Sequence, residues 1–327
     1  MANKQFRVKS VIARIPVVPG SFALVDIPRQ YDSESISFRL TGQVQVTAGF
    51  SSVRAEAPTQ LIQRVDIVAD GRNQIVSAPY WALVFGSTDR NNKFSFNSRS
   101  VTAPTGAGSA TYNIEALGVY DYCLADGERS KDSNFPTQSL SLYQMRLTFG
   151  AAADLFVGGG TAVLINCFVE VTYTEMVEIP DADGKRTMPF FMKKMSFQEY
   201  APGGNNANFE VRIPAGNLIK SVLMRTDGFA TAGEPSIAVI KNVIVRAGQD
   251  VRLNVTGDSL RAENNMQLGQ VLPGYYFHDF TKAAGNSARM TELFDVTRQA
   301  EPKVIFDVNA NAATKIGVVI TEMLAYS

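Results

Sequence analysis

The stretch LIQRVDIVADG, Leu61 to Gly71, alternates apolar odd positions with mostly polar even positions and then turns at its glycine. The same pattern returns 178 residues later in VIKNVIVRAG, Val239 to Gly248. At this offset Leu61, Val65, Ile67 and Ala69 fall on Val239, Val243, Val245 and Ala247. Period-two alternation that ends at glycine is typical of a half-buried strand entering a turn. The two stretches therefore predict one β-domain that is present twice.

Further similarities occur in the same order along the chain. FALVDIP (Phe22 to Pro28) resembles NFEVRIP (Asn208 to Pro214) at an offset of 186. ISFRL and VLMRT share this offset, and YTEM (Tyr173 to Met176) resembles ITEM (Ile320 to Met323) at an offset of 147. The alternative is that β-strands simply draw on few residue types. The offset falls along the chain, which indicates that the first copy contains more residues than the second. The additional residues lie in a long loop at about 86–113, rich in Ser, Thr, Asn and Gly.

Composition limits the function classes. A chain of 327 residues has room for two domains of about 150 residues each. Its 45% hydrophobic and 19% charged residues indicate a packed protein, and its zero net charge argues against a sequence-specific nucleic-acid binder. No secretory signal and no run of about 18 apolar residues is found, so we expect synthesis in a cytoplasm. Cys123 and Cys167 are interpreted as reduced core thiols.

Strand-like segments at short spacing, punctuated by Gly, Pro and Asn, predict an all-β fold of two tandem antiparallel sandwiches with about eight strands each. We assign residues 22–180 to the first sandwich and 208–327 to the second, and expect no amphipathic helix of ten or more residues. The expected strands are 22–27, 36–46, 61–69, 75–85, 112–124, 140–149, 163–177, 209–213, 219–225, 237–247, 251–255, 275–280, 304–308 and 316–324. Residues 260–274 are interpreted as a connecting loop.

Residues 1–21 are predicted to form a basic N-terminal arm. Up to Ile15 this segment carries Lys4, Arg7, Lys9 and Arg14 and no acidic residue. One interpretation is a solvated, loosely packed arm. The other is contact with an anionic surface, lipid head groups or nucleic acid, which rests on charge alone.

Residues 181–207 are predicted to be a linker or strap between the copies. Its turn-like ends flank a middle in which Met188, Phe191, Met192 and Met195 fall at helical spacing, and Pro189 suits a first helical turn. We expect a short helix or ordered strap packed on a sandwich. A strap that touches a membrane is the less favoured alternative.

The residue types that carry chemistry are sparse, and no catalytic, cofactor-binding or metal-binding residue is predicted. The single histidine, His278, has no nucleophile elbow near it in the sequence and is interpreted as a structural strand residue. Asp181 to Gly184 begins like a calcium loop but lacks its later glycine and closing glutamate. Trp81, the only tryptophan, is expected in the core, while the Tyr and Phe content leaves carbohydrate binding open.

The ordered segments resemble a known family. LIQRVDIVADGRNQIVSAPYWAL is similar to the first-roll strand pair, and FEVRIPAGNLIKSVLMRT with VIKNVIVRAGQDVRL to the opening of the second roll, of double jelly-roll major capsid proteins. These proteins form the shells of tailless icosahedral bacteriophages with an internal membrane, in the lineage that includes the adenovirus hexon. The resemblance covers about Phe22 to Met323.

This resemblance implies two eight-stranded jelly rolls and a structural protein, not an enzyme. It also implies pseudo-hexagonal homotrimers that tile an icosahedral virion shell, together with minor capsid or penton proteins and membrane proteins. The basic arm would face the interior, where Lys4, Arg7, Lys9 and Arg14 could meet lipid head groups. Two alternatives remain open: a carbohydrate-binding or carbohydrate-active double sandwich, and a phage spike or accessory protein.

Overall fold

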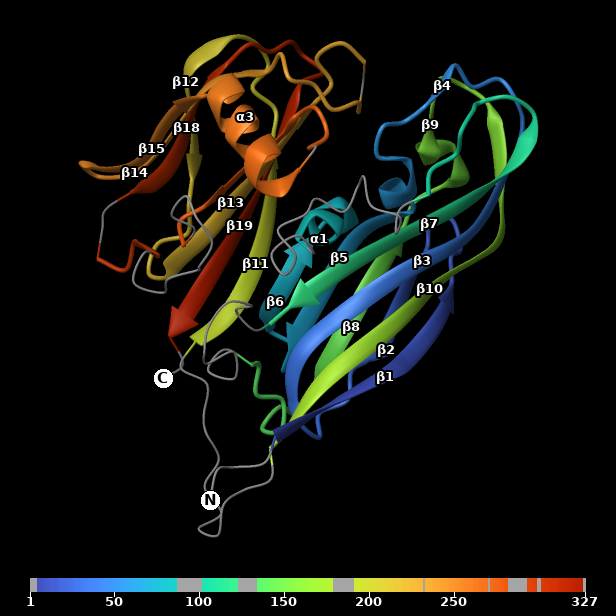
Figure 1. The fold of residues 1–327 in the computed structure, drawn as a ribbon, viewed down its shortest axis with the longest axis horizontal. Coiled ribbons are helices and arrows are strands. Elements are labelled where there is room, and N and C mark those ends of the chain that lie inside the picture. The colour runs from blue at the N-terminus through green and yellow to red at the C-terminus, as the bar shows by residue number, and fades with distance from the viewer. Residues whose placement is uncertain are drawn as a thin grey trace. The chain divides into compact units, whose positions relative to one another are not determined.

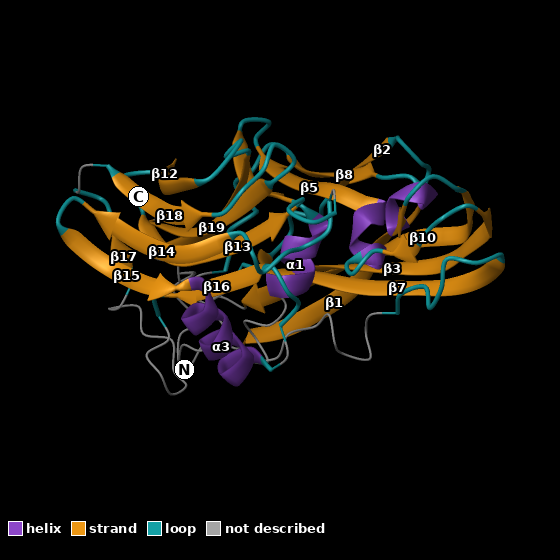
Figure 2. Ribbon diagram, turned by 90° about the horizontal axis from the view of Figure 1, so that it is seen from above, coloured by secondary structure: helices purple, strands orange, loops and turns teal. Residues whose placement is uncertain are grey.

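The computed structural model describes residues 5–86, 102–122, 134–178, 191–231, 233–269, 271–281, 293–298 and 301–325. The chain divides into two compact units, which are described separately: Met1–Lys193 with Tyr326–Ser327, and Lys194–Ala325. Strands make up most of the described residues in both units (Figures 1 and 2).

The first unit contains two layers of strands. One layer has the order β1-β10-β3-β7 and the other the order β6-β5-β8-β2, and neighbouring strands in both layers are antiparallel. The strands are β1 (Gln5–Pro16), β2 (Phe22–Asp26), β3 (Asp32–Ala48), β5 (Ile62–Ala69), β6 (Asn73–Ala78), β7 (Ala110–Asp121), β8 (Tyr143–Phe149) and β10 (Thr161–Glu178). A minor pair, β4 (Ser52–Val53) with β9 (Phe156–Val157), and the 3-10 turns Ala57–Leu61 and Ala152–Leu155 complete this unit.

The second unit repeats this plan. Its layers have the orders β16-β13-β19-β11 and β12-β18-β14-β15. The strands are β11 (Phe191–Tyr200), β12 (Asn206–Arg212), β13 (Leu218–Asp227), β14 (Ile240–Ala247), β15 (Asp250–Thr256), β16 (Tyr275–Asp279), β18 (Pro302–Val308) and β19 (Lys315–Ala325). The short β17 (Phe294–Asp295) pairs with β13.

The two units share one connectivity. When the eight long strands of each unit are counted along the chain, both units place strands 1, 8, 3 and 6 in one layer and strands 2, 7, 4 and 5 in the other. This order is that of a jelly roll, an antiparallel double-sheet arrangement. The predicted fold, two tandem jelly rolls, is confirmed, and the segments that repeat in sequence occupy equivalent strands.

The repeated hairpins have buried odd-numbered faces, as the alternation predicts. In β5 the side chains of Val65, Ile67 and Ala69 are buried, and the turn after it uses Asp70 and Gly71, both at positive φ. In β14 the equivalent Val243, Val245 and Ala247 are buried. Gly248 also has positive φ, and the turn here has only two residues because Ala247 pairs with Asp250.

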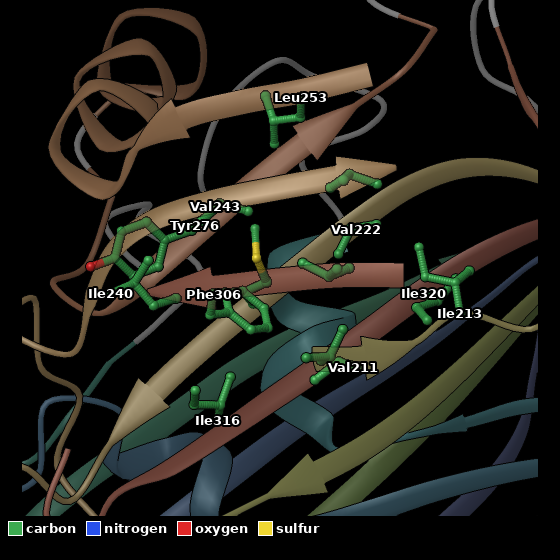
Figure 3. Close-up of a cluster of buried hydrophobic side chains, with 14 of the residues drawn as sticks. Val211, Ile213, Val222, Ile240, Val243, Leu253, Tyr276, Phe306, Ile316 and Ile320 are labelled. Atoms are coloured by element: carbon green, nitrogen blue, oxygen red, sulfur yellow. The ribbon is translucent and has the colours of Figure 1, made fainter. Parts of the chain in front are cut away.

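Each roll is held together by apolar side chains that its two layers bury against each other. In the second unit they come from seven of the eight long strands (Figure 3). One layer contributes Val211, Val304 and Val245 to this core, and the other layer contributes Val222 and Ile320. Burying a side chain of this size stabilises the fold by about 1.5–3 kcal/mol. In the first unit Phe38, Leu147 and Val169 are equally buried, and Trp81 lies in the core as predicted.

Two segments differ from expectation. Residues 5–16 of the predicted arm form β1, which pairs with β10 from Gln5 to Pro16. Alternation is weak there because residues 6–11 are all exposed, as befits an edge strand. Within the predicted linker, residues 191–200 form β11 rather than a helix, and β12 begins at Asn206. Met188 lies outside the described residues.

Two helices replace an expected strand end and an expected loop. Helix α1 (Tyr80–Gly86) follows β6 in the first unit, and α3 (Gly257–Leu268) follows β15 in the second. In α1 every residue from 80 to 85 is buried, so its sequence has no amphipathic period to reveal a helix. The prediction of a loop at 260–274 is wrong for its first nine residues, which complete α3.

Helix α3 was missed because its buried stripe is partly polar. Leu260, Asn264 and Leu268 point inward at four-residue spacing. The Asn264 amide donates to the Phe277 carbonyl and accepts from the Phe277 N–H, both at 2.7 Å. The side chain thus satisfies both backbone groups of Phe277 on β16, as a neighbouring strand would do. Thr256 caps the helix by accepting from the Ser259 N–H.

Candidate functional site

The first unit presents two edge strands on the same side of its sandwich. β1 ends one layer and β2 ends the other. Residues 17–21 join them and can span at most about 17 Å, while packed sheets lie about 10 Å apart. The ends of this connection are fixed, because the Val17 N–H donates to the Cys167 carbonyl and the Ser21 carbonyl accepts from the Phe149 N–H. We call this surface the β1/β2 edge.

Exposed apolar side chains concentrate at the β1/β2 edge. Of the large apolar residues exposed in the described part of the first unit, six belong to β1, β2 or their connection: Phe6, Val8, Val11, Val18, Phe22 and Leu24. Another, Leu142, directly precedes β8, the partner strand of β2. Gathered apolar exposure of this kind marks an interaction surface, whereas scattered single residues do not.

β2 directs its exposed residues outward by simple alternation. Phe22, Leu24 and Asp26 are exposed, and Ala23 and Val25 between them are half-buried. Phe22 and Leu24 remain 56% and 59% exposed, respectively, although both are large and apolar. Single exposed residues of this type are common, but β2 carries two on one strand face, and β1 and the connection carry four more.

Polar partners on β8 hold the outer face of β2. The guanidinium carbon of Arg146 lies 4.4 Å from the ring centroid of Phe22, a cation–π contact. Gln144 Nε2 donates to Asp26 Oδ1 at 2.7 Å. These contacts link the outer face of β2 to β8, while Phe22 and Leu24 remain exposed to solvent.

The second unit lacks this apolar edge at the equivalent strand. At the offset of 186, Phe22, Leu24 and Asp26 of β2 correspond to Asn208, Glu210 and Arg212 of β12. All three are exposed. The two rolls therefore share a backbone plan but present different chemistry at the same edge, so they suit different neighbours.

The predicted basic residues have different surroundings. Arg7 Nε lies 2.5 Å from Glu34 Oε2, and the Glu34 side chain is only 3% exposed. The guanidinium carbon of Arg14 is 4.6 Å from the Phe168 ring centroid, and Arg14 is opposite Glu170 in the sheet. Lys9 is exposed opposite Thr174, while Lys4 lies outside the described residues. The structure thus gives Arg7 and Arg14 partners within the chain.

The titratable and nucleophilic side chains that could take part in catalysis lie within the fold. His278 is on β16, and burial lowers the pKa of its imidazole. Cys167 is buried, its thiol is 3.2 Å from the Gln43 carbonyl, and burial raises its pKa. Burial also raises the pKa values of Tyr122 and Tyr143, whose hydroxyls hydrogen-bond each other. Cys123 and Asp181 to Gly184 lie outside the described residues.

The described part of the chain also lacks two kinds of functional feature. Its residues include no group of three or more His, Cys, Asp or Glu side chains arranged to hold a metal ion. No helix there is both long and apolar enough to cross a membrane.

The sequence indicated β2 but not its role as a surface. The signal was weak, because Phe22 to Val25 are four consecutive apolar residues and give no contrast between the faces of the strand. The burial pattern in the folded chain shows that Phe22 and Leu24 lie on the solvent side of β2.

Comparisons with known proteins support the fold. No protein-family model matches the sequence, and no curated protein matches it. Among solved structures, the crystal structure of the STIV MCP is 14% identical and covers 98% of this chain and 97% of its own, with a TM-score of 0.74. The structure of Sulfolobus Turreted Icosahedral Virus matches at 14% identity, 98% and 91% coverage, and a TM-score of 0.73.

A bacterial virus gives a similar match. The major capsid protein P2 from Bacteriophage PM2 is 13% identical and covers 98% of both chains, with a TM-score of 0.62. All these matches extend over nearly the whole chain, including both rolls. The chain therefore has the double jelly-roll fold found in viral major capsid proteins.

Proposed function

We propose that this protein is a major capsid protein that self-associates into homotrimers, and that the trimers tile an icosahedral virus shell. The observation that carries the proposal is the double jelly roll itself, matched over 98% of the chain in viral capsid structures. The role is structural rather than catalytic. The protein would be made in the host cytoplasm and reside in the virion.

Geometry supports the trimer. Each chain has two similar rolls, so a trimer with three-fold symmetry contains six similar rolls. Such a trimer can pack like a hexagon although it has only three chains. A cyclic trimer uses heterologous contacts, in which one surface of a copy meets a different surface of the next. The differing edges β2 and β12 fit such contacts, since identical edges would not distinguish neighbours. The apolar β1/β2 edge is the proposed contact in the first roll.

The test is the mass of the purified protein in solution, measured by light scattering. A particle of three times 35.6 kDa supports the proposal. A monomer that persists at high concentration contradicts it. Electron microscopy of the same sample would distinguish closed tiles from irregular aggregates.

We further propose that the basic N-terminal region contacts anionic lipid head groups in a virion with an internal membrane, and that minor capsid, penton and membrane proteins complete the shell. The support for the lipid contact is charge alone. Lys4 and Lys9 would carry it, since Arg7 and Arg14 contact Glu34 and Phe168.

Flotation with vesicles that contain phosphatidylglycerol tests the lipid contact. The trimer should float with these vesicles, and K4Q/K9Q should not. Equal flotation of both proteins, or no flotation of the wild type, would contradict the lipid proposal without affecting the trimer proposal.

A further inference from the structure

Three basic residues form one row across the outer face of the β12-β18-β14-β15 layer. Arg212 on β12 is opposite Lys303 on β18, and Lys303 is opposite Arg246 on β14. Their neighbours Val211, Val304 and Val245 point into the core. Because side chains alternate between the two faces of a strand, all three cations share the outer face.

This row brings three positive charges close together beside the carboxylate of Glu210. Adjacent strands are about 4.8 Å apart, so the three cations are close neighbours, and like charges directly opposite each other repel. Glu210 Oε1 accepts from Lys303 Nζ at 2.7 Å. The pKa of Glu210 is lowered first by this hydrogen bond and then by the charges of Lys303, Arg246 and Arg212. The Glu210 carboxylate thus interacts electrostatically with all three cations.

Arg246 also has an unmet hydrogen-bonding group. Its Nε is buried and has no acceptor among the described residues. A buried donor without an acceptor is unfavourable, and most native structures avoid it. An acidic group from outside the chain would not need to reach this buried atom to offset the repulsion between the three cations of the row.

The first roll provides an internal comparison. At the offsets of the repeat, Arg212 corresponds to Asp26 and Arg246 to Val68. In the first roll, Asp26 is opposite Gln144 and Gln144 is opposite Val68. This row needs no external group, because Gln144 donates to Asp26 within the chain. The jelly roll therefore does not require cations here, and their presence in the second roll calls for another reason.

We infer that the Arg212–Lys303–Arg246 row binds acidic side chains of a second copy of this chain. The inference rests on the proposed self-association. The whole chain has 31 basic and 31 acidic residues, so a local positive surplus implies a negative surplus elsewhere on every copy. A nucleic acid suits the row less well, because a protein that binds one usually carries a basic surplus and this chain has none. Val251, opposite Arg246 and half exposed, adds an apolar neighbour of the kind protein interfaces contain.

The experiment compares the association of the full-length wild type, R212Q, R246Q and R212Q/R246Q by sedimentation velocity over a range of protein and salt concentrations. Arg212 is exposed, so R212Q should fold normally even if R246Q does not. R64Q is the matched control, because Arg64 lies in the equivalent layer of the first roll and pairs with Asp66. Melting temperatures verify the fold of each variant.

We expect R212Q/R246Q to need about tenfold more protein than the wild type or R64Q to reach the same association, and R212Q about threefold more. The difference should narrow in high salt, which screens the wild-type contact. Association of R212Q and R212Q/R246Q equal to that of R64Q would overturn the inference while leaving self-association intact. A wild type that stays monomeric would instead refute the proposed function, and the inference with it. Variants that associate normally but lose binding to phosphatidylglycerol vesicles would assign the row to lipid and overturn the inference.

Discussion

The guanidinium of Arg146 covers the ring of Phe22, with 4.4 Å between the guanidinium carbon and the ring centroid. The contact joins β8 to the exposed face of the edge strand β2. It keeps a large aromatic ring fixed at the surface, where it can pack against another molecule without first losing side-chain freedom. This arrangement would suit the contact proposed for the β1/β2 edge.

Removing the apolar side chains of this edge should weaken self-association. The variant F22S/L24S loses two side chains, each of which contributes about 1.5–3 kcal/mol when buried. We expect at least about a tenfold rise in the dissociation constant, measured by sedimentation equilibrium, with an unchanged melting temperature. N208S is the matched control, since Asn208 is the repeat equivalent of Phe22. If F22S/L24S associates as tightly as N208S, the edge is not the contact.

The ion pair between Lys220 and Asp279 should be critical for the second roll. Lys220 Nζ and Asp279 Oδ2 are 2.8 Å apart, and the side chains are only 5% and 3% exposed. K220M leaves the Asp279 carboxylate buried without this partner, so we expect a loss of about 3–5 kcal/mol in the free energy of unfolding by urea.

The control for this pair is K315M, because Lys315 contacts Glu199 at the same 2.8 Å but both side chains are about half exposed. It should cost less than about 1 kcal/mol. Similar losses for K220M and K315M would show that burial does not set the contribution of the pair.

Asn264 should anchor α3 to β16. N264A removes two hydrogen bonds to the Phe277 backbone, and we expect a cost of about 1–3 kcal/mol per group left unpaired. Hydrogen exchange of the Phe277 amide should accelerate. Q267A changes an exposed residue on the same helix and should alter neither quantity. Unchanged exchange at Phe277 in N264A would contradict this role.

The single histidine should report the packing of β16. Burial lowers the pKa of His278 below its ordinary 6.5, so the unfolded chain takes up a proton before the folded one as the pH falls. Its contribution to stability is therefore fully present above about pH 6.5 and declines below it. NMR should give a midpoint below 6.5, and H278Q should lose less stability between pH 7.5 and 5.5. A midpoint at or above 6.5 would contradict this burial effect.

The sequence indicated the strands well where one face is buried and the other is not. Alternation in 61–69 and 239–247 fits a sheet with one wet face, and the structure buries the expected side chains. The fourteen expected strands each overlap a strand of the structure. Prediction was poorer where polar and apolar residues do not separate onto two faces of an element. Helix α1 is apolar throughout, and α3 has the polar Asn264 on its buried face.

The candidate surfaces were less accessible to sequence reasoning. The basic residues before Ile15 suggested an arm, but an edge strand with both faces near solvent shows the same lack of alternation. The partners of Arg7 and Arg14, namely Glu34 and Phe168, are distant in sequence. The row of Arg212, Lys303 and Arg246 exists only through strand pairing across separations of up to 91 residues.

The sequence by itself determined the duplicated all-β plan, because apolar residues recur at every second position within a single strand. This pattern is local and can be recognised without knowing which strands pair. The tertiary structure decided which strands lie at the edges, which apolar residues remain exposed and which charges meet. These depend on the order of strands in the layers, and long-range hydrogen bonding sets that order. Phe22 and Leu24 are exposed because they lie on the outer face of β2, and that placement depends on the pairing of β2 with the distant strand β8.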